Sequence, residues 1–297
     1  GFTPPQEPGL GTVDTIRAML DGQVKVFFAL GGNFAAATPD TVQTWKALRQ
    51  CDLTVHVTTK LNRSHIVHGR DALILPCLGR TEMDMQAGGL QGVTVEDSMS
   101  MVHISMGINP PAAPDLLSEP AIVARLAAAT LGARSQTPWL WLVEDYSRIR
   151  DKIADVFVDF ADFNTRVSVP GGFRLRNTAS ERVWITGPGK AVFKTHAVPT
   201  GTPLQRARER KGDAIVFALM TTRSHDQYNT TIYGHDDRYR GVYGHRRVVF
   251  IHADDLKDLG LQAGDWVDIT SLYCAEGSAD VQQRRADRFV LVAYDIP

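Results

Sequence analysis

Cysteine is scarce in this sequence. The 297 residues include three cysteines, Cys51, Cys77 and Cys274, with no CxxC pair among them. This scatter excludes the cysteine-rich patterns of zinc and iron–sulfur sites within the chain, and an odd number argues against a disulfide framework. We therefore expect the reducing environment of the cytoplasm.

Long apolar runs and an excess of one charge are also missing. No uninterrupted apolar stretch approaches the roughly 20 residues that cross a bilayer, and no signal peptide opens the sequence. Lys plus Arg number 32 against 33 for Asp plus Glu, so the net charge of -1 provides no overall basic field for nucleic acid. We expect neither a membrane nor a nucleic acid as a partner.

The two ends of the sequence suggest a part of a longer protein. It opens with GFTPPQEPGLGT, without an initiator methionine, and closes with LVAYDIP directly after a strand-like run. Hydrophobic residues make up 43% of the 297 positions, which is enough for two domains with cores of their own.

The first half alternates strand and helix patterns. VKVFFAL (24–30), LTVHV (53–57) and DALIL (71–75, stopped by Pro76) are apolar runs with short polar connections, as in a parallel sheet covered by helices. Thr38 before Pro39 predicts one helix start. Further helices are predicted from Ser118 to a stop at Gly132, and over 139–154. These patterns predict a doubly wound, mostly parallel α/β domain.

The second half is different in character. Residues 160–212 are rich in Gly, Pro and Arg and are interpreted as a connection. AIVFALM (214–220), RVVFIHADDLKDLGLQAGDWVDIT (247–270) and RFVLVAYD (288–295) predict short strands with one small helix, hence a compact β-barrel. The predicted domains are 1–205 and 206–297.

Two loops of the first domain are candidate binding sites. Gly31-Gly32-Asn33 follows a strand end, where a parallel sheet often binds ligands near a helix N-terminus, but it is equally compatible with a tight turn. It lacks the GxGxxG and GxxxxGK[ST] spacings. TTKLNRSH (58–65) offers hydroxyls, an amide and cations for phosphate or ribose oxygens, or forms a solvated loop. Cys77, after the third strand, is either a nucleophile or a structural cysteine.

The densest polar tract is SHDQYNTTIYGHDDRYRGVYGH (224–245). His225, His235 and His245 with the aspartates beside them could form the metal site of a hydrolase, although no HExxH-type motif is present. The alternative is a site for a polar heterocycle and its pyrophosphate, with Arg223 for phosphate. Its neutral donors and acceptors are Thr221, Thr222, Ser224, Gln227, Tyr228, Asn229 and Thr230.

Six segments, in order along nearly the whole chain, carry a family resemblance. They are VFFALGGNF, CDLTVHVTTKLNRSHIVHG, LILPCLGRTE, VEDSMSMVH, RSHDQYNTTIYG and LGLQAGDWVDI. Together they resemble the carboxyl-terminal half of molybdopterin oxidoreductases, in particular formate dehydrogenase-like alpha subunits. The resemblance implies an α/β domain followed by a double-psi-like β-barrel, the molydopterin dinucleotide-binding domain. The barrel continues beyond VAYDIP in the family.

The resemblance also implies a cofactor and its contacts. The cofactor is bis-molybdopterin guanine dinucleotide with molybdenum or tungsten, and the metal ligand and any iron–sulfur cluster belong to amino-terminal domains outside this chain. Thr58 to Asn62 would hold the guanosine end, although relatives often have an acidic residue where this chain has Thr58-Thr59-Lys60. Arg223 would face phosphate. The implied contacts are Gly31, Gly32, Asn33, Thr58, Thr59, Lys60, Asn62, Thr222, Arg223, Ser224, Gln227, Tyr228, Asn229 and Thr230.

Three functions follow as hypotheses. The first is cofactor binding within an oxidoreductase acting on formate or a similar small substrate, with the missing domains and an electron-transfer subunit as partners; the chain alone would be inactive. The second is a metal-dependent hydrolase that uses residues 224–245. The third is a scaffold that binds a partner subunit and no small molecule, which would require an exposed apolar face.

Overall fold

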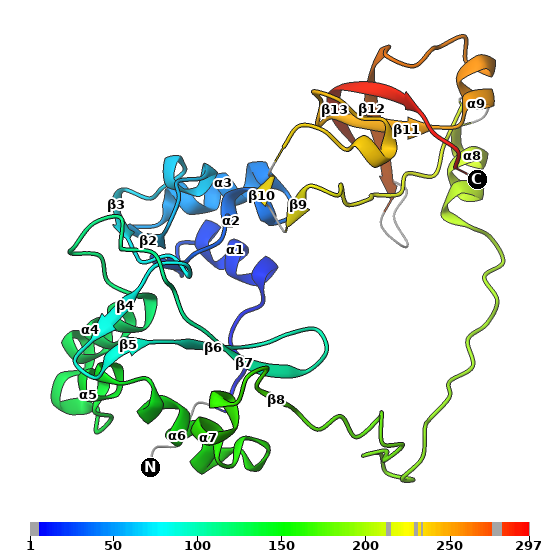
Figure 1. Cartoon of the computed structure of the whole chain (residues 1–297). Helices are drawn as coiled ribbons and strands as arrows, with labels where there is room; N and C mark the ends of the chain where they lie inside the picture. Colours follow the sequence, from blue (N-terminus) through cyan, green and yellow to red (C-terminus); the bar gives the residue numbers. More distant parts are fainter. Residues whose placement is uncertain (1–5, 212–214, 229–230, 233, 275–280, 297) are drawn as a thin grey trace. The chain divides into compact units, whose positions relative to one another are not determined.

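The structure is a computed structural model, and it describes residues 6–211, 215–228, 231–232, 234–274 and 281–296. Internal contacts divide the chain into two compact units, Gly1–Phe193 and Lys194–Pro297 (Figure 1). The boundary predicted between residues 205 and 206 falls inside helix α8 (Pro203–Lys211), which belongs to the second unit.

The first unit contains the predicted parallel strands. β1 (Val26–Leu30), β2 (Leu53–Thr58) and β3 (Asp71–Pro76) pair in that order, and both pairings are parallel as predicted. Helices α1 (Thr12–Leu20), α2 (Phe34–Ala37) and α3 (Thr41–Gln50) accompany them. Buried Met19 of α1 and Ala47 of α3 form one core with Phe27 of β1 packed against it, so these helices anchor the sheet from which the candidate loops extend.

Helix α3 begins later than the sequence predicted. Asp40 is the N-cap in place of Thr38, with a left-handed φ of 55°, and its carboxylate accepts a hydrogen bond from the Gln43 amide at 3.3 Å. Aspartate tolerates this conformation better than most residues because its short side chain bonds to nearby backbone. Thr38 instead donates its hydroxyl to the Phe34 carbonyl at 2.9 Å and closes α2.

The remainder of the first unit consists of small sheets and four helices. β4 (Asp84–Gln86) pairs with β5 (Gly89–Gln91), and β7 (Met101–Ser105) lies between β6 (Val93–Glu96) and β8 (Phe173–Arg174). The helices are α4 (Glu119–Leu131), α5 (Trp139–Glu144), α6 (Ser147–Val156) and α7 (Phe163–Ser168).

The helical predictions for this region are partly confirmed. Ser118 caps α4 and Gly132 ends it, as predicted. The single helix predicted over 139–154 is wrong, because the chain breaks at Asp145, whose backbone is extended. The Asp145 carboxylate accepts the Ser147 amide at 2.9 Å and so starts α6 as a separate helix.

The second unit is built around a three-stranded sheet. β13 (Val281–Ala293) pairs in parallel with β11 (Val248–Ile251) and antiparallel with β12 (Trp266–Cys274). Helix α9 (Ala253–Asp258) follows β11, and its Leu256 packs with Ile251 and Leu291. A short pair, β9 (Gln227–Tyr228) and β10 (Thr231–Ile232), precedes this sheet in the chain.

One predicted strand is absent from the described part of this unit. Residues 215–220 of AIVFALM have no regular secondary structure, and the side chains of Ile215 and Leu219 are 67% and 65% exposed. A strand needs a hydrogen-bonded neighbour, which apolar composition alone does not supply. The doubly wound sheet and the barrel stay predictions. Among the described residues, no helix is both long and apolar enough to cross a membrane.

Candidate functional site

The carboxyl ends of β1 and β2 bring two predicted loops together. The Gly31 amide donates to the Val57 carbonyl at 2.8 Å, and Asn62 Nδ2 donates to the Gly32 carbonyl at 2.7 Å. Gly31 and Gly32 have φ values of 69° and 77°, a conformation that glycine adopts without a steric penalty. The Gly31–Asn33 turn and the loop after β2 therefore form one structure.

Hydrogen bonds between polar side chains and backbone hold this structure. Ser64 Oγ accepts the buried Ala35 amide at 3.0 Å and contacts Asn33 Oδ1 at 3.3 Å. Asn62 Oδ1 accepts the Ser64 amide at 2.9 Å, while His65 Nδ1 accepts the Asn62 amide at 2.9 Å. We call Gly31, Gly32, Asn33, Asn62 and Ser64 the turn cluster. Its two asparagines brace the loops, and the cofactor contact expected of them stays a prediction.

The other predicted residues after β2 differ in exposure. Thr58 is buried, and its hydroxyl donates to the Lys60 carbonyl at 2.8 Å. Thr59 and Lys60 are exposed. Of these three residues, Thr59 and Lys60 therefore present their side chains to solvent.

A buried histidine pair lies beneath the turn cluster. The rings of His56 on β2 and His65 have centroids 4.9 Å apart, and the Nε2 atoms of both are buried without a hydrogen-bond partner among the residues that the structure describes. Burial lowers the pKa of His56, and the neighbouring His65 and His68 lower it further. The neutral ring is therefore the form that the fold accommodates.

Cys77 follows β3 and is buried. Burial raises the pKa of its thiol to about 11, with Glu119 and then Glu82 adding to the shift. A nucleophilic cysteine needs the opposite, a pKa lowered by nearby positive charge. The structural interpretation of this residue is favoured.

In the second unit, the loop before β9 contains the remaining predicted contacts. Thr222 and Arg223 are exposed, and Gln227 Oε1 lies 3.4 Å from Ser224 Oγ. Ser224 Oγ also accepts a hydrogen bond from Arg246 Nη1 at 2.9 Å. Tyr228 contributes its backbone to β9, whereas Asn229 and Thr230 lie outside the described residues.

His225 has a different partner from the other two regularly spaced histidines. Its Nδ1 lies 2.9 Å from Oδ1 of buried Asp237, and Arg240 Nη1 donates to Oδ2 of the same carboxylate at 2.8 Å. Burial alone would raise the pKa of Asp237, but the hydrogen bonds from Arg240 and His225 outweigh it and the pKa is lowered. Among the described residues, no group of three or more His, Cys, Asp or Glu is arranged to hold a metal.

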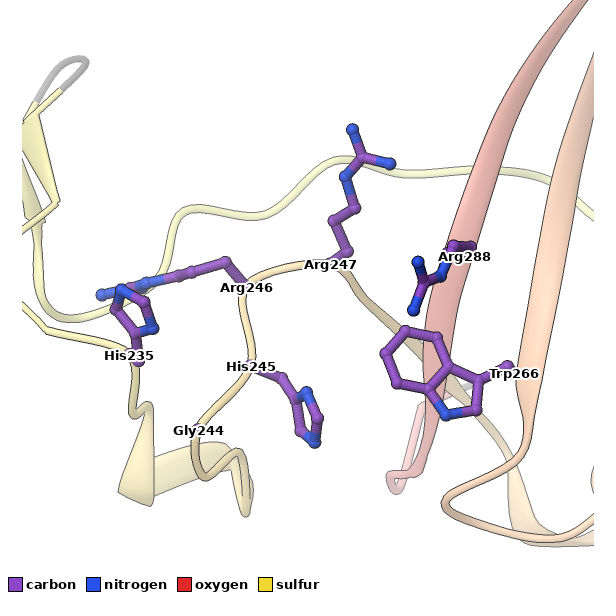
Figure 2. Close-up of a pocket in the computed structure, with 7 residues that line it drawn as sticks. All are labelled: His235, Gly244, His245, Arg246, Arg247, Trp266 and Arg288. Atoms are coloured by element: carbon purple, nitrogen blue, oxygen red, sulfur yellow. The ribbon is translucent and has the colours of Figure 1, made fainter.

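A basic pocket of about 320 Å³ lies elsewhere in the second unit (Figure 2). His235 and His245 line it together, so two of the three spaced histidines share one site. Figure 2 shows the Arg246 side chain reaching beside His235, while Arg288 lies close to the Trp266 ring. The side chains of this basic pocket are His235, His245, Arg246, Arg247, Trp266 and Arg288, and Gly244 completes its wall.

Sequence reasoning missed the cations and the tryptophan of this pocket. Arg246 and Arg247 directly precede β11, and Trp266 opens β12, so they are far apart in the chain. The available signals were the adjacent arginine pair and a large aromatic residue at the start of a strand. Neither signal indicates by itself that β11, β12 and β13 assemble these residues at one place.

Comparison with known proteins identifies the second unit. Residues 217–290 match the family model of the molydopterin dinucleotide binding domain. The chain thus contains a molydopterin dinucleotide-binding domain. It is 51% identical over 298 residues to an uncharacterized oxidoreductase of Mycobacterium tuberculosis, covering 100% of this chain and 37% of the relative. It is 47% identical over 294 residues to the protein YdeP of Escherichia coli, covering 99% and 37%.

Two facts locate the candidate sites relative to the matched domain and to the relatives. The Ser224 loop and the basic pocket lie inside the matched span of 217–290, whereas the turn cluster lies outside it. The chain spans 37% of the length of the curated relatives described above. The family resemblance seen in the sequence is thus confirmed, at the level of a molybdopterin oxidoreductase.

Proposed function

We propose that this chain binds and orients a molybdopterin guanine dinucleotide in a formate dehydrogenase-like enzyme. The observation that carries the proposal is the loop Thr222–Gln227 within the matched domain, where exposed Arg223 follows a threonine and Ser224 is bonded to a second arginine. Cations with hydroxyls and amides suit phosphate and a polar heterocycle.

The residues of the first unit also fit such a group. A Cβ atom added at Gly32 would meet no atom within 4 Å, so the backbone there is open to a close ligand. Exposed Thr59 and Lys60 supply a hydroxyl and a cation beside it. The guanosine end of one dinucleotide would lie at Thr58–Asn62, and a second dinucleotide would be held by Thr222–Thr230.

The bound cofactor supplies redox chemistry at molybdenum or tungsten, and the protein supplies binding and orientation. In this proposal the metal ligand and any iron–sulfur cluster belong to the rest of the longer protein. Formate or a similar small molecule is the substrate, an electron-transfer subunit is a partner, and the enzyme works in the cytoplasm. The chain alone has no turnover.

The test is cofactor retention by the longer protein purified from cells that make the cofactor. Released pterin is quantified by its fluorescence for the parent, for Arg223→Ala and for Gly32→Ala, with Arg284→Ala as the matched control. We expect Arg223→Ala to reduce retention about tenfold or more, as loss of a charged hydrogen bond implies. Undiminished retention in both Arg223→Ala and Gly32→Ala would contradict the proposal.

A further inference from the structure

One face of the parallel sheet in the first unit carries apolar side chains that are exposed on both outer strands. Paired residues of parallel strands point to the same face, and the register places Phe28 of β1 opposite Val55 of β2, which lies opposite Leu73 of β3. Phe28, Leu30 and Leu73 are 38%, 49% and 51% exposed, whereas Val55 and Val57 of the middle strand are buried. We call this surface the open sheet face, and its residues are Val26, Phe28, Leu30, Leu53, Val55, Val57, Leu73 and Leu75.

The segments that connect the three strands pack on the opposite face. Phe27 of β1 points to that face, and its ring centroid lies 4.9 Å from that of Phe34 in α2. On β2, the ring of His56 lies 4.9 Å from that of His65, which belongs to the short helix (Arg63–Ile66) between β2 and β3. Phe27 also packs against the core formed by α1 and α3. Both connections and α1 therefore lie on the Phe27 face.

The order of the strands explains why the connections gather on one face. β1, β2 and β3 are neighbours in the sheet in the same order as in the chain. Because the connections between parallel strands are right-handed, strands added in one direction place their connections on the same face. Helices reach the other face when the chain also adds strands in the opposite direction, beyond β1. In the described ranges β1 pairs with β2 alone, so no such strand is present there.

The relatives have enough additional chain to cover the open sheet face. The part that aligns with the Mycobacterium tuberculosis relative is 37% of that protein, so nearly two thirds of its length lies outside the alignment. Parallel sheets occur almost only with helices on both faces. The charged residue at the margin of the face, Asp71, already pairs with Arg70 at 3.4 Å. The face therefore offers apolar contact, which suits the apolar stripe of a helix.

We propose that the open sheet face packs against helices from the part of the longer polypeptide that lies outside these 297 residues. Those helices bury Phe28, Leu30 and Leu73 and complete the second helical layer of the sheet. The inference does not rest on the cofactor function, because it uses only the packing of the sheet and the length of the relatives. Loss of pterin retention and loss of this contact are therefore separate results.

The experiment places the photoreactive residue p-benzoylphenylalanine at position 28, and separately at position 73, of the longer protein. Crosslinked peptides are identified by mass spectrometry. We expect crosslinks from both positions to peptides of the same polypeptide outside the 297 residues. Position 42 is the matched control, because Val42 is 75% exposed on α3, which packs on the Phe27 face. Its yield of such crosslinks should be lower by about fivefold or more, since crosslinking requires contact.

Thiol labelling of the longer protein provides a second measurement. A maleimide should modify Phe28→Cys more slowly than Val42→Cys by about tenfold or more, because a packed helix shields the first position. Leu73→Cys, on the outer strand β3, covers the case in which Phe28→Cys fails to fold. Equal labelling of face and control positions, crosslinks to a second copy in a mixture of isotopically light and heavy protein, or crosslinks confined to the 297 residues would each overturn the inference. Equal crosslinking from position 42 would overturn it as well.

Discussion

The turn cluster of the first unit and the basic pocket of the second use polar side chains in opposite ways. In the turn cluster, Asn62 and Ser64 bond to the backbone of the loops that they join. In the basic pocket, Arg246 has one satisfied donor group and two buried nitrogen atoms without partners in the described ranges. Satisfied groups stabilise the fold, whereas unsatisfied groups gain most from a ligand. The two regions should therefore respond differently to substitution.

The largest effect is expected at a buried carboxylate of the second unit, Asp237. Asp237→Asn removes the charge that Arg240 and His225 share, and it should lower the free energy of unfolding of the second unit by about 2–3 kcal/mol. Urea unfolding followed by hydrogen exchange of the β11 and β13 amides measures this. Asp226→Asn, in the same loop, should change the free energy by less than about 0.5 kcal/mol. Equal effects of the two variants would contradict the role given to Asp237.

The stabilisation by Asp237 should also depend on pH. The pKa of this carboxyl is lowered below its ordinary value of 3.8, so its contribution is complete above that value. It is lost as the pH falls through the lowered pKa. In the wild type, the protection of second-unit amides from hydrogen exchange, corrected for the intrinsic rate at each pH, should fall below about pH 4, and Asp237→Asn should show a smaller change over the same range.

One serine in each region allows a direct comparison: Ser64 in the turn cluster, and Ser224, which is bonded to Arg246 of the basic pocket. Ser64→Ala leaves the buried Ala35 amide without its acceptor and should cost the first unit about 2 kcal/mol of stability. Ser224→Ala releases only Nη1 of Arg246, so the cost in stability should stay below about 1 kcal/mol. Thermal unfolding of both variants tests this. The comparison fails if the two variants lose equal stability.

The smallest effect concerns His56. The pKa of His56 is lowered below the ordinary 6.5 in the folded state. Just below pH 6.5 the unfolded chain therefore binds a proton at this residue, whereas the folded chain keeps the ring neutral. The stability of the first unit should be constant above about pH 6.5 and decline below it by up to about 1.4 kcal/mol per pH unit. His56→Phe keeps a ring beside Phe27 and His65, and urea unfolding at pH 5 and 7.5 should show a smaller difference. An unchanged difference would assign the dependence to other groups.

Local patterns predicted most of the parallel strands but not all of the helix ends. The apolar runs of β1 to β3 were recognisable because parallel strands carry apolar residues on both faces, although only β2 is mostly buried in the described structure. Asp40 and Asp145 were missed as boundaries because their carboxylates bond to amides two or three residues ahead, which competes with continued helix. Residues 215–220 were wrongly predicted to form a strand, because an apolar composition does not provide a partner strand.

The candidate sites also differ in whether the sequence alone could identify them. The Gly31–Asn33 turn and Arg223 were identifiable because motif order along the chain marks them. The basic pocket was not, because Arg246, Trp266 and Arg288 come together only through the pairing of β12 with β13 and β11 with β13. His235 and His245, which the sequence offered as metal ligands, do share a location, but there they line a pocket with arginines and a tryptophan.

The buried thiol at the end of β3 has a consequence for handling the protein. With a pKa of about 11, the Cys77 side chain is ionised in only about one molecule in ten thousand at pH 7. Alkylating reagents and peroxides react with the thiolate, so this position should stay intact under aerobic purification. The first unit thus keeps this cysteine chemically inert under conditions that oxidise exposed, ionised thiols.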